Sequence, residues 1–422
     1  MALPSKLNLP IPSAESLALS QQLAVIIQQN IKNNGGWISF ADFMQMALYT
    51  PNLGYYAGGA RKFGQAGDFV TAPEISPLFA KTLARQAAQI LAATHADILE
   101  LGAGTGKLAA DLLLELEQLN QLPSQYFILE VSAYLRQVQR ETLQKILPAK
   151  LFERVTWLET LPPSPQSFPA QGEGVVLSEL LDIPPSPLVG EGWGEGSKGF
   201  NGLILANEVL DAIPAHILHK TTQGWREHGV AFEEGFVWKD DELTQPNLAE
   251  NLPDNIPVNY ITEVCPAASA LVCSLAECLE SGAILLIDYG FGAAEYYHPQ
   301  RNTGTLMCHY QHYAHDNPLI NIGLQDITAH VNFTQIALAA QAQAARLAGY
   351  LTQAQFLINC GILELLGQTS PNNMAEYAPL AAAAQKLLSP AEMGDLFKVI
   401  AFVKNMDEPL IGFKSGDKAH AL

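Results

Sequence analysis

The stretch Asp97-Ile-Leu-Glu-Leu-Gly-Ala-Gly-Thr-Gly-Lys107 decides the fold of this chain. A short apolar run that includes the acidic residue Glu100 leads directly into glycines at positions 102, 104 and 106, and an Ala/Leu-rich segment with helical spacing follows, from Leu108 to about Leu119. This order predicts a strand, a tight glycine turn and a helix. Glycines suit such a turn because the chain reverses sharply and a ligand can approach a backbone that has no Cβ. We therefore expect a nucleotide-like cofactor to lie across the turn.

The glycine spacing and the carboxylate before it favour one class of cofactor. A dinucleotide site places pyrophosphate at the helix N-terminus and usually has the spacing G-x-G-x-x-G, whereas this loop has G-x-G-x-G. The Glu100 carboxylate would repel pyrophosphate, but it suits a cationic ligand such as the α-amino group of S-adenosylmethionine (SAM) near its sulfonium. Glu130 closes the next apolar run and is interpreted either as a ribose ligand or as an ordinary solvated strand end. The loop thus predicts SAM, with NAD as the less favoured ligand.

The residues predicted to bind the cofactor are Glu100, Gly102, Ala103, Gly104, Thr105, Gly106, Glu130 and Asn207.

Composition limits the class of protein. A chain of 422 residues has room for one large α/β domain with additions, or for two domains. Because the net charge is −19 and no basic stripe offsets it, no nucleic-acid partner is expected. The five cysteines lack C-x-x-C spacing, and the N-terminus lacks the pattern of a signal or transit peptide, so we expect reduced thiols and a cytoplasmic location. No apolar run approaches the length of a membrane span, so membrane insertion is not expected, and the oligomeric state stays open.

Short apolar runs alternate with helical patterns through the middle of the chain. The expected strands are Ile98–Leu101, Tyr126–Glu130, Arg154–Leu158, Gly202–Ala206 and Ala283–Asp288. This alternation predicts an α/β fold, with a Rossmann-like parallel sheet and helices on both faces. Ligands of such sheets bind beyond the carboxyl ends of the strands, where Glu100, Glu130, Asn207 and Asp288 fall. Further along, the segment 396–403 predicts a late antiparallel strand, and the Ala-rich segment 336–348 predicts a helix.

The remaining segments are interpreted as additions to this core. The predicted boundaries are 1–90 for an N-terminal helical segment and active-site loop, 91–214 and 261–422 for the core, 161–199 for a flexible Pro/Gly-rich insertion, and 215–260 for a small β addition. Ser39 is expected to cap a helix within the N-terminal segment, and residues 51–77 are expected to be a loop. Trp193 is interpreted as part of the insertion and not as a binding residue.

Several segments together resemble one known family. They are Gly67-Asp-Phe-Val-Thr-Ala-Pro-Glu-Ile-Ser76, the loop from Glu100 to Gly106, Ala206-Asn-Glu-Val-Leu-Asp-Ala-Ile-Pro214, Leu286-Ile-Asp-Tyr-Gly-Phe291, and Gly323-Leu-Gln-Asp-Ile-Thr-Ala-His-Val-Asn-Phe333. On these residues the chain resembles the MidA-type class I SAM-dependent methyltransferases, a family related to the mitochondrial complex I assembly protein-arginine methyltransferase. The resemblance implies methylation of a protein substrate, at arginine and in a respiratory complex I subunit. Two alternatives stay open: a non-catalytic SAM-binding assembly factor, and an NAD-dependent oxidoreductase.

The resemblance also suggests site residues. Glu208 is expected to orient the methyl acceptor, with Asp211 as a second carboxylate; the alternative is that both only charge the first turn of a helix ending near Pro214. His330 is predicted either to act in the site or to be a buried structural histidine. The residues expected to contact the substrate or to form a lid are Asp68, Thr71, Glu74, Asp288 and Tyr289. No metal is expected, because the cluster His309, His312 and His315 has no accompanying cysteine or carboxylate pattern suited to zinc.

Overall fold

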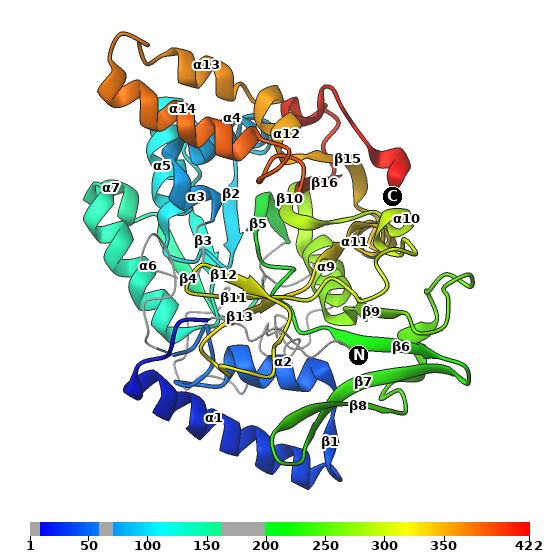
Figure 1. The fold of residues 1–422 in the computed structure, drawn as a ribbon. Helices are drawn as coiled ribbons and strands as arrows, with labels where there is room; N and C mark the ends of the chain where they lie inside the picture. The colour runs from blue at the N-terminus through cyan, green and yellow to red at the C-terminus, as the bar shows by residue number, and fades with distance from the viewer. Residues whose placement is uncertain (1–8, 59–70, 162–198) are drawn as a thin grey trace, which may run out of the picture. The chain divides into compact units, whose positions relative to one another are not determined.

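The computed structural model describes residues 9–58, 71–161 and 199–422, which form two compact units (Figure 1). The first unit comprises Met1–Val70, Pro214–Cys265 and Pro299–Ala329, and the second comprises Thr71–Ile213, Pro266–His298 and His330–Leu422. The expected boundaries differ in three places. Residues 71–90 belong with the core of the second unit, because helix α4 packs against its sheet, whereas residues 261–265 and 299–329 belong with the first unit.

The second unit is built on an eight-stranded mixed sheet. Its strand order is β15 (Arg346–Thr352), β16 (Phe397–Lys404), β10 (Leu279–Phe291), β5 (Phe200–Asn207), β2 (Asp97–Leu101), β3 (Tyr126–Leu129) and β4 (Val155–Leu158), with β14 (Val331–Asn332) beside β10. The five expected strands all form and run parallel from β10 to β4, while β16 is antiparallel to β10, as predicted. The fold class is therefore confirmed.

Helices cover both faces of this sheet because its central strands are apolar along both sides. The helices in the described part of this unit are α3 (Ala72–Ile75), α4 (Pro77–Thr94), α5 (Lys107–Gln118), α6 (Ala133–Ile146), α7 (Ala149–Phe152), α9 (Pro266–Cys278), α10 (Ala293–Tyr296), α11 (Phe333–Ala342), α12 (Gln353–Asn359), α13 (Ile362–Gly367) and α14 (Met374–Leu388). Leu203 and Leu205 of β5 share one buried cluster with α4 and α5, whereas the intervening Ile204, also fully buried, lies outside that cluster. Helices α9 and α11, which pack on each other and on β10, cover this second face.

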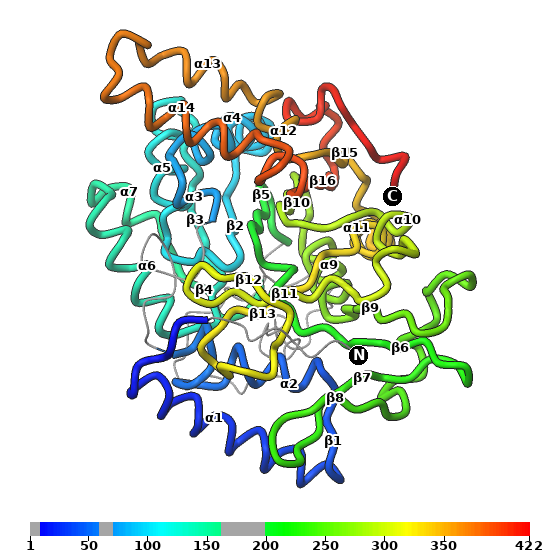
Figure 2. The backbone as a smooth tube through the Cα atoms, viewed as in Figure 1, coloured from blue at the N-terminus to red at the C-terminus, as the bar shows by residue number. Residues whose placement is uncertain are grey.

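The Ala-rich segment 336–348 was predicted as one helix, and this prediction is wrong at its C-terminal end. Helix α11 stops at Ala342, and the edge strand β15 begins at Arg346. Ala344 between them has φ +60°, a left-handed conformation that ends a helix. The C-terminal segment then runs back to β15, where the Lys418 amide donates to the carbonyl of Tyr350 over 2.6 Å (Figure 2).

Among its described residues, the first unit combines two helices with two small antiparallel sheets. The helices are α1 (Ala14–Asn33) and α2 (Phe40–Tyr49), with a short 3₁₀ turn, η1 (Pro246–Ala249). The five-stranded sheet has the order β1 (Trp37–Ile38), β7 (Gly224–Phe232), β6 (His216–Thr221) and β9 (Ile261–Val264), with β8 (Phe236–Asp241) also pairing with β7. The second sheet has the order β12 (Tyr313–His315), β11 (Met307–Tyr310) and β13 (Asp326–Thr328). The expected β addition at 215–260 is thus part of a larger sheet.

Two local predictions for the N-terminal region have different outcomes. The Ser39 side chain caps α2 by accepting the Asp42 amide over 3.0 Å, as predicted. Within the expected loop 51–77, residues Ala72–Ile75 form the short helix α3 instead, and residues 59–70 lie outside the described part. The predicted insertion, including Trp193, also falls almost entirely outside the described residues. In the part of the chain that the structure describes, no helix has both the length and the apolarity to cross a bilayer.

Candidate functional site

The glycine loop joins β2 to α5, and its three glycines have distinct surroundings. All have positive φ, +58° at Gly102, +53° at Gly104 and +83° at Gly106. A Cβ on Gly102 would lie 2.9 Å from a methyl of Val209, and one on Gly106 would lie 3.2 Å from the Cα of Gln139. A Cβ on Gly104 would meet nothing within 4 Å. Two of the glycines therefore permit close packing of the chain, while Gly104 borders open space that a ligand can enter.

Glu100 lies at the end of β2, directly before this loop. Its side chain is buried, and Oε2 accepts a hydrogen bond from the hydroxyl of Tyr126 over 2.7 Å. Burial raises the pKa of Glu100 to about 7; the Tyr126 bond opposes this shift, and the neighbouring Glu130 adds to it. A cationic ligand group beside Glu100 would stabilise the carboxylate, so binding of such a ligand should favour the ionised form of this side chain.

Glu130 follows β3 and is tied to the glycine loop through Gln139. Its Oε1 accepts the Ser132 amide and its Oε2 accepts the Gln139 side-chain amide, both over 2.9 Å. The same Gln139 amide donates to the carbonyl of Gly104 over 3.1 Å, and its Oε1 accepts the indole N–H of Trp157 over 2.9 Å. A carboxylate has about four lone-pair sites, and the N–H groups of Ser132, Gln139 and Val131 use three, so Glu130 retains acceptor capacity for a ribose hydroxyl. The sequence analysis missed Gln139 and Trp157, because their link to the loop spans separate elements.

Helix α3 is bound to the same loop. The Thr105 hydroxyl donates to Oε1 of Glu74 over 2.5 Å, which joins two of the predicted site residues. Thr71 is the N-cap residue of α3, although its side chain makes no capping hydrogen bond. Ala103 is buried within the loop, and Asp68 lies outside the described residues.

The chain leaves β5 through an unusual turn at Asn207 and Glu208. Glu208 has φ +54°, which is uncommon for a residue other than glycine. Its amide donates to the carbonyl of Ile287 over 2.9 Å, and the Asn207 side-chain amide donates to Oε1 of Glu208 over 2.9 Å. Residues 208–213 form a turn and no helix. The alternative in which Glu208 and Asp211 charge the first turn of a helix is therefore wrong.

Asp288, near the C-terminal end of β10, holds this turn in place. Its Oδ2 accepts the amides of Leu210 and Asp211 over 2.9 and 3.2 Å, and its Oδ1 accepts the amide of Tyr289 over 2.8 Å. Burial raises the pKa of Asp288 well above the ordinary value, and the charges of Asp211 and Glu208 add to the rise. Asp288 thus holds the turn with Oδ2, while the amide of Tyr289, its neighbour in β10, satisfies Oδ1.

Two acceptor atoms of the turn are buried and lack donors. Among the described residues, neither Oδ1 of Asn207 nor Oδ1 of Asp211 has a hydrogen-bond partner. Burial raises the pKa of Asp211, whereas a hydrogen bond from Tyr289 lowers it. A buried acceptor without a donor is costly, so a pair of them beside a cofactor loop indicates a ligand rich in N–H or O–H groups.

His330 lies on the same side of the second unit's sheet as Tyr289, just before β14. Its ring meets that of Tyr289 edge-on, with centroids 5.0 Å apart, and stacks on Phe291 at 5.3 Å and 13°. Tyr289 therefore links His330 to Asp211. The structure brings together Glu208, Asp211, Asp288, Tyr289 and His330 at the ends of β5 and β10, and Val209 packs this group against the glycine loop.

Comparisons with known proteins agree with this geometry. Residues 82–351 match the family model described as "Putative S-adenosyl-L-methionine-dependent methyltransferase". The protein arginine methyltransferase NDUFAF7, mitochondrial, of Homo sapiens is 31% identical over 393 residues, covering 89% of this chain and 82% of that protein. Its Mus musculus counterpart is 30% identical over 407 residues, covering 92% and 86%.

Solved structures extend the likeness to nearly the whole fold. A COG1565 superfamily member from Burkholderia thailandensis, crystallised with S-adenosyl-homocysteine, is 43% identical, with a TM-score of 0.87 over 98% of this chain and all of that one. A native structure of a COG1565 superfamily protein from the same organism is 42% identical with a TM-score of 0.85, covering 98% of this chain and 100% of that one.

The residues present fit SAM. Gly104 leaves room beside the loop, Glu100 offers a carboxylate for an ammonium group, and Glu130 keeps acceptor capacity for a ribose hydroxyl. The expected cofactor and the MidA-type resemblance are both confirmed by the comparisons. The chain therefore belongs to the family of S-adenosylmethionine-dependent methyltransferases.

Proposed function

We propose that this protein methylates arginine side chains of a protein substrate, and that Glu208 and Asp211 receive the guanidinium. Relatives that are about 30% identical over most of the chain are named protein arginine methyltransferases, which supports this acceptor. The observation that carries the proposal is the buried pair of acceptors on Asn207 and Asp211, beside the Glu208 carboxylate and next to the glycine loop.

The chemistry of the turn suits a guanidinium. A guanidinium has five N–H donors in one plane and no acceptor, so it can satisfy several buried oxygens at once. Paired carboxylates can fix its plane through parallel hydrogen bonds, and this alignment is what an in-line displacement requires. SAM supplies an electrophilic methyl group on its sulfonium.

The turn residues have separable roles in this proposal. Glu208 orients the guanidinium, and the Asn207 side-chain amide holds its carboxylate by donating to Oε1. With SAM bound, the S–CH3 bond would break as the new C–N bond forms, leaving neutral S-adenosylhomocysteine, and a guanidinium N–H proton would pass to Oδ1 of Asp211. Burial raises the pKa of this carboxyl towards neutrality and makes it a better base. Asp288 positions both groups through its bonds to the turn amides.

The test is methyl transfer from radiolabelled SAM to arginine-containing and lysine-containing peptides, followed by acid hydrolysis and identification of the labelled amino acid. We expect label only in methylated arginine. Glu208→Gln should lower kcat on the order of 100-fold while leaving the affinity for S-adenosylhomocysteine unchanged, since the loss is confined to the acceptor side. Glu392→Gln, an exposed carboxylate far along the chain, is the matched control and should retain wild-type kcat.

Label in lysine, or equal rates for Glu208→Gln and wild type, would refute the proposal. Absence of any labelled product, with cofactor binding intact, would favour the alternative of a non-catalytic assembly factor.

The proposal also includes the identity of the natural acceptor protein and the cellular location. A respiratory complex I subunit is proposed as the acceptor on the resemblance alone, and comparison of methylarginine sites in cells with and without the protein would test it. A cytoplasmic location stays a prediction, while the curated relatives named above are mitochondrial by name. Cell fractionation with an antibody to the protein would decide between these locations.

A further inference from the structure

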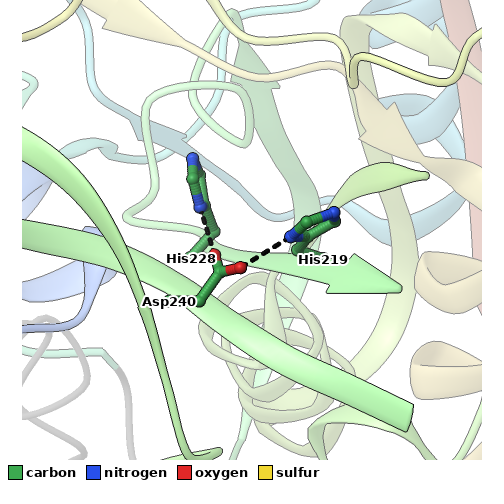
Figure 3. A group of neighbouring side chains, drawn as sticks. All are labelled: His219, His228 and Asp240. Carbon is green, nitrogen blue, oxygen red and sulfur yellow. Dashed lines mark hydrogen bonds and ion pairs between the residues drawn. The ribbon is translucent and has the colours of Figure 1, made fainter. Parts of the chain in front are cut away.

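Three metal-ligating side chains meet on the five-stranded sheet of the first unit, outside the methyltransferase core. They are His219 of β6, His228 of β7 and Asp240 of β8 (Figure 3). Nδ1 of His219 lies 2.7 Å from Oδ2 of Asp240, and Nδ1 of His228 lies 2.5 Å from its Oδ1. We propose that these residues bind a first-row transition-metal cation, with Zn²⁺ as the ion best suited to them.

The strand register fixes this convergence. His228 lies directly opposite Asp240 in the β7–β8 pair, and His219 lies opposite Arg226 in the β6–β7 pair. Arg226 and His228 are two residues apart on one strand, so they share a face of the sheet. All three ligands therefore project from the same face, each from a different strand.

The imidazole rings are held before any metal arrives. The ring of His228 stacks on Trp238 with centroids 4.7 Å apart and an interplanar angle of 13°. Trp238 in turn packs on the buried Phe40 at 5.1 Å, and His219 meets His228 edge-on at 6.0 Å. Packed neighbours of this kind set ligand orientation and raise metal affinity by reducing the ordering that binding requires.

The ligand set matches the chemistry of zinc. Two imidazoles and one carboxylate leave a fourth tetrahedral position for water, and the partial exposure of all three side chains gives an ion and water access. Ligand atoms around a tetrahedral zinc are separated by about 3.3 Å, so each hydrogen-bonded nitrogen and oxygen would move apart by about 0.6 to 0.8 Å. When Nδ1 of an imidazole binds the metal, its proton must move through solvent to Nε2. In both rings Nε2 points away from Asp240, so it can accept that proton (Figure 3).

The charged neighbours are compatible with a bound cation. Arg226 shares the face, but its guanidinium lies 3.8 Å from the exposed carboxylate of Glu242, so this positive charge has its own partner. The opposing view is that Asp240 is only a structural carboxylate shared by two hydrogen-bonded imidazoles. That view predicts no metal affinity beyond that of surface histidines, which makes the two interpretations separable.

The experiment titrates the full-length, tag-free and metal-free chain with Zn²⁺ by calorimetry, and with Co²⁺ by visible absorption. We expect one bound ion per chain, a tetrahedral Co²⁺ spectrum, and a rise in Tm when Zn²⁺ is added. Asp240→Asn and His228→Gln should each weaken binding at least tenfold and abolish the rise in Tm. His312→Asn is the matched control, because His312 is an exposed histidine of the first unit at positive φ, and it should bind like wild type.

Circular dichroism of each metal-free variant identifies any that fails to fold, and His219→Gln serves as the replacement. Absence of stoichiometric binding by wild type overturns the proposal without any variant. Unchanged affinity in folded Asp240→Asn and His228→Gln also overturns it, as does loss of binding in His312→Asn alone, which would place the ion near β11 and β12.

Discussion

Cofactor binding should be coupled to the ionisation of Glu100. Burial raises the pKa of this side chain to about 7, so it is mostly neutral at pH 6 in the unliganded protein. A ligand ammonium group beside it favours the carboxylate, so the ionised form is the one competent to bind. The ionised fraction rises from about 0.09 at pH 6 to about 0.76 at pH 7.5, and the affinity for S-adenosylhomocysteine should therefore rise about eightfold.

Isothermal titration calorimetry at both pH values measures this change directly. Repeating the titration at pH 6 in buffers with different ionisation enthalpies should reveal release of nearly one proton for each ligand bound. Glu100→Gln cannot ionise at this position, so its affinity should vary little between the two pH values. Glu117→Gln is the matched control, because it removes an exposed carboxylate of α5 and leaves Glu100 and its buried neighbours unchanged.

Tyr126→Phe gives an independent check on the direction of the effect. The hydroxyl of Tyr126 lowers the pKa of Glu100 by donating to its carboxylate, so its removal should move the rise in affinity to higher pH. An eightfold rise that persists in Glu100→Gln would assign the pH dependence to another group. A flat wild-type profile would refute the placement of the ligand's ammonium beside Glu100.

Three further outcomes are expected from the structure. Because the folded-state pKa of Glu100, about 7, lies above its usual 4.5, the folded form binds more protons between pH 4.5 and about 7, and the free energy of unfolding falls as pH rises. Glu100→Gln should therefore recover up to ~3 kcal/mol of unfolding free energy at pH 8. Urea denaturation of the unliganded protein measures this gain. Gly104→Val should abolish S-adenosylhomocysteine binding by filling the open space beside the loop, whereas Gly35→Val, at another positive-φ glycine with open surroundings, should keep it; equal binding in both would contradict the site. Ser39→Ala should cost about 1 kcal/mol of stability by removing the cap of α2, and an unchanged urea midpoint would show that the cap contributes nothing.

Local chemistry explains which parts of the site were predictable from sequence. The glycine loop, Glu100 and Glu130 could be located because a strand, a turn and a helix follow one another within a few residues. The core strands were predictable for the same reason, since each contains a short apolar run, although β5 and β10 extend beyond the expected bounds at both ends. The capping role of Ser39 was predictable because its hydroxyl group immediately precedes an apolar helix.

Features that depend on register or on a single backbone angle were not predictable. Nothing in the segment 336–348 marks Ala344 as left-handed, so its alanines were interpreted as one long helix. The meeting of His219, His228 and Asp240 depends on how three strands align, although the two histidines flank the turn of a single hairpin. The link from Gln139 to both Glu130 and Gly104 likewise exists only after α6 has packed against the loop.

If Glu208 orients the acceptor as proposed, its left-handed backbone sets stability against methyl transfer at one position. A residue with a side chain loses roughly 1–2 kcal/mol of folding free energy in that conformation. Glycine would avoid this loss and would leave the hydrogen bonds from the turn amides to Asp288 in place. Selection for heat resistance alone should therefore enrich Glu208→Gly, yielding sturdier proteins that no longer modify their target. Relatives that keep glutamate at position 208 would then be under selection for catalytic turnover.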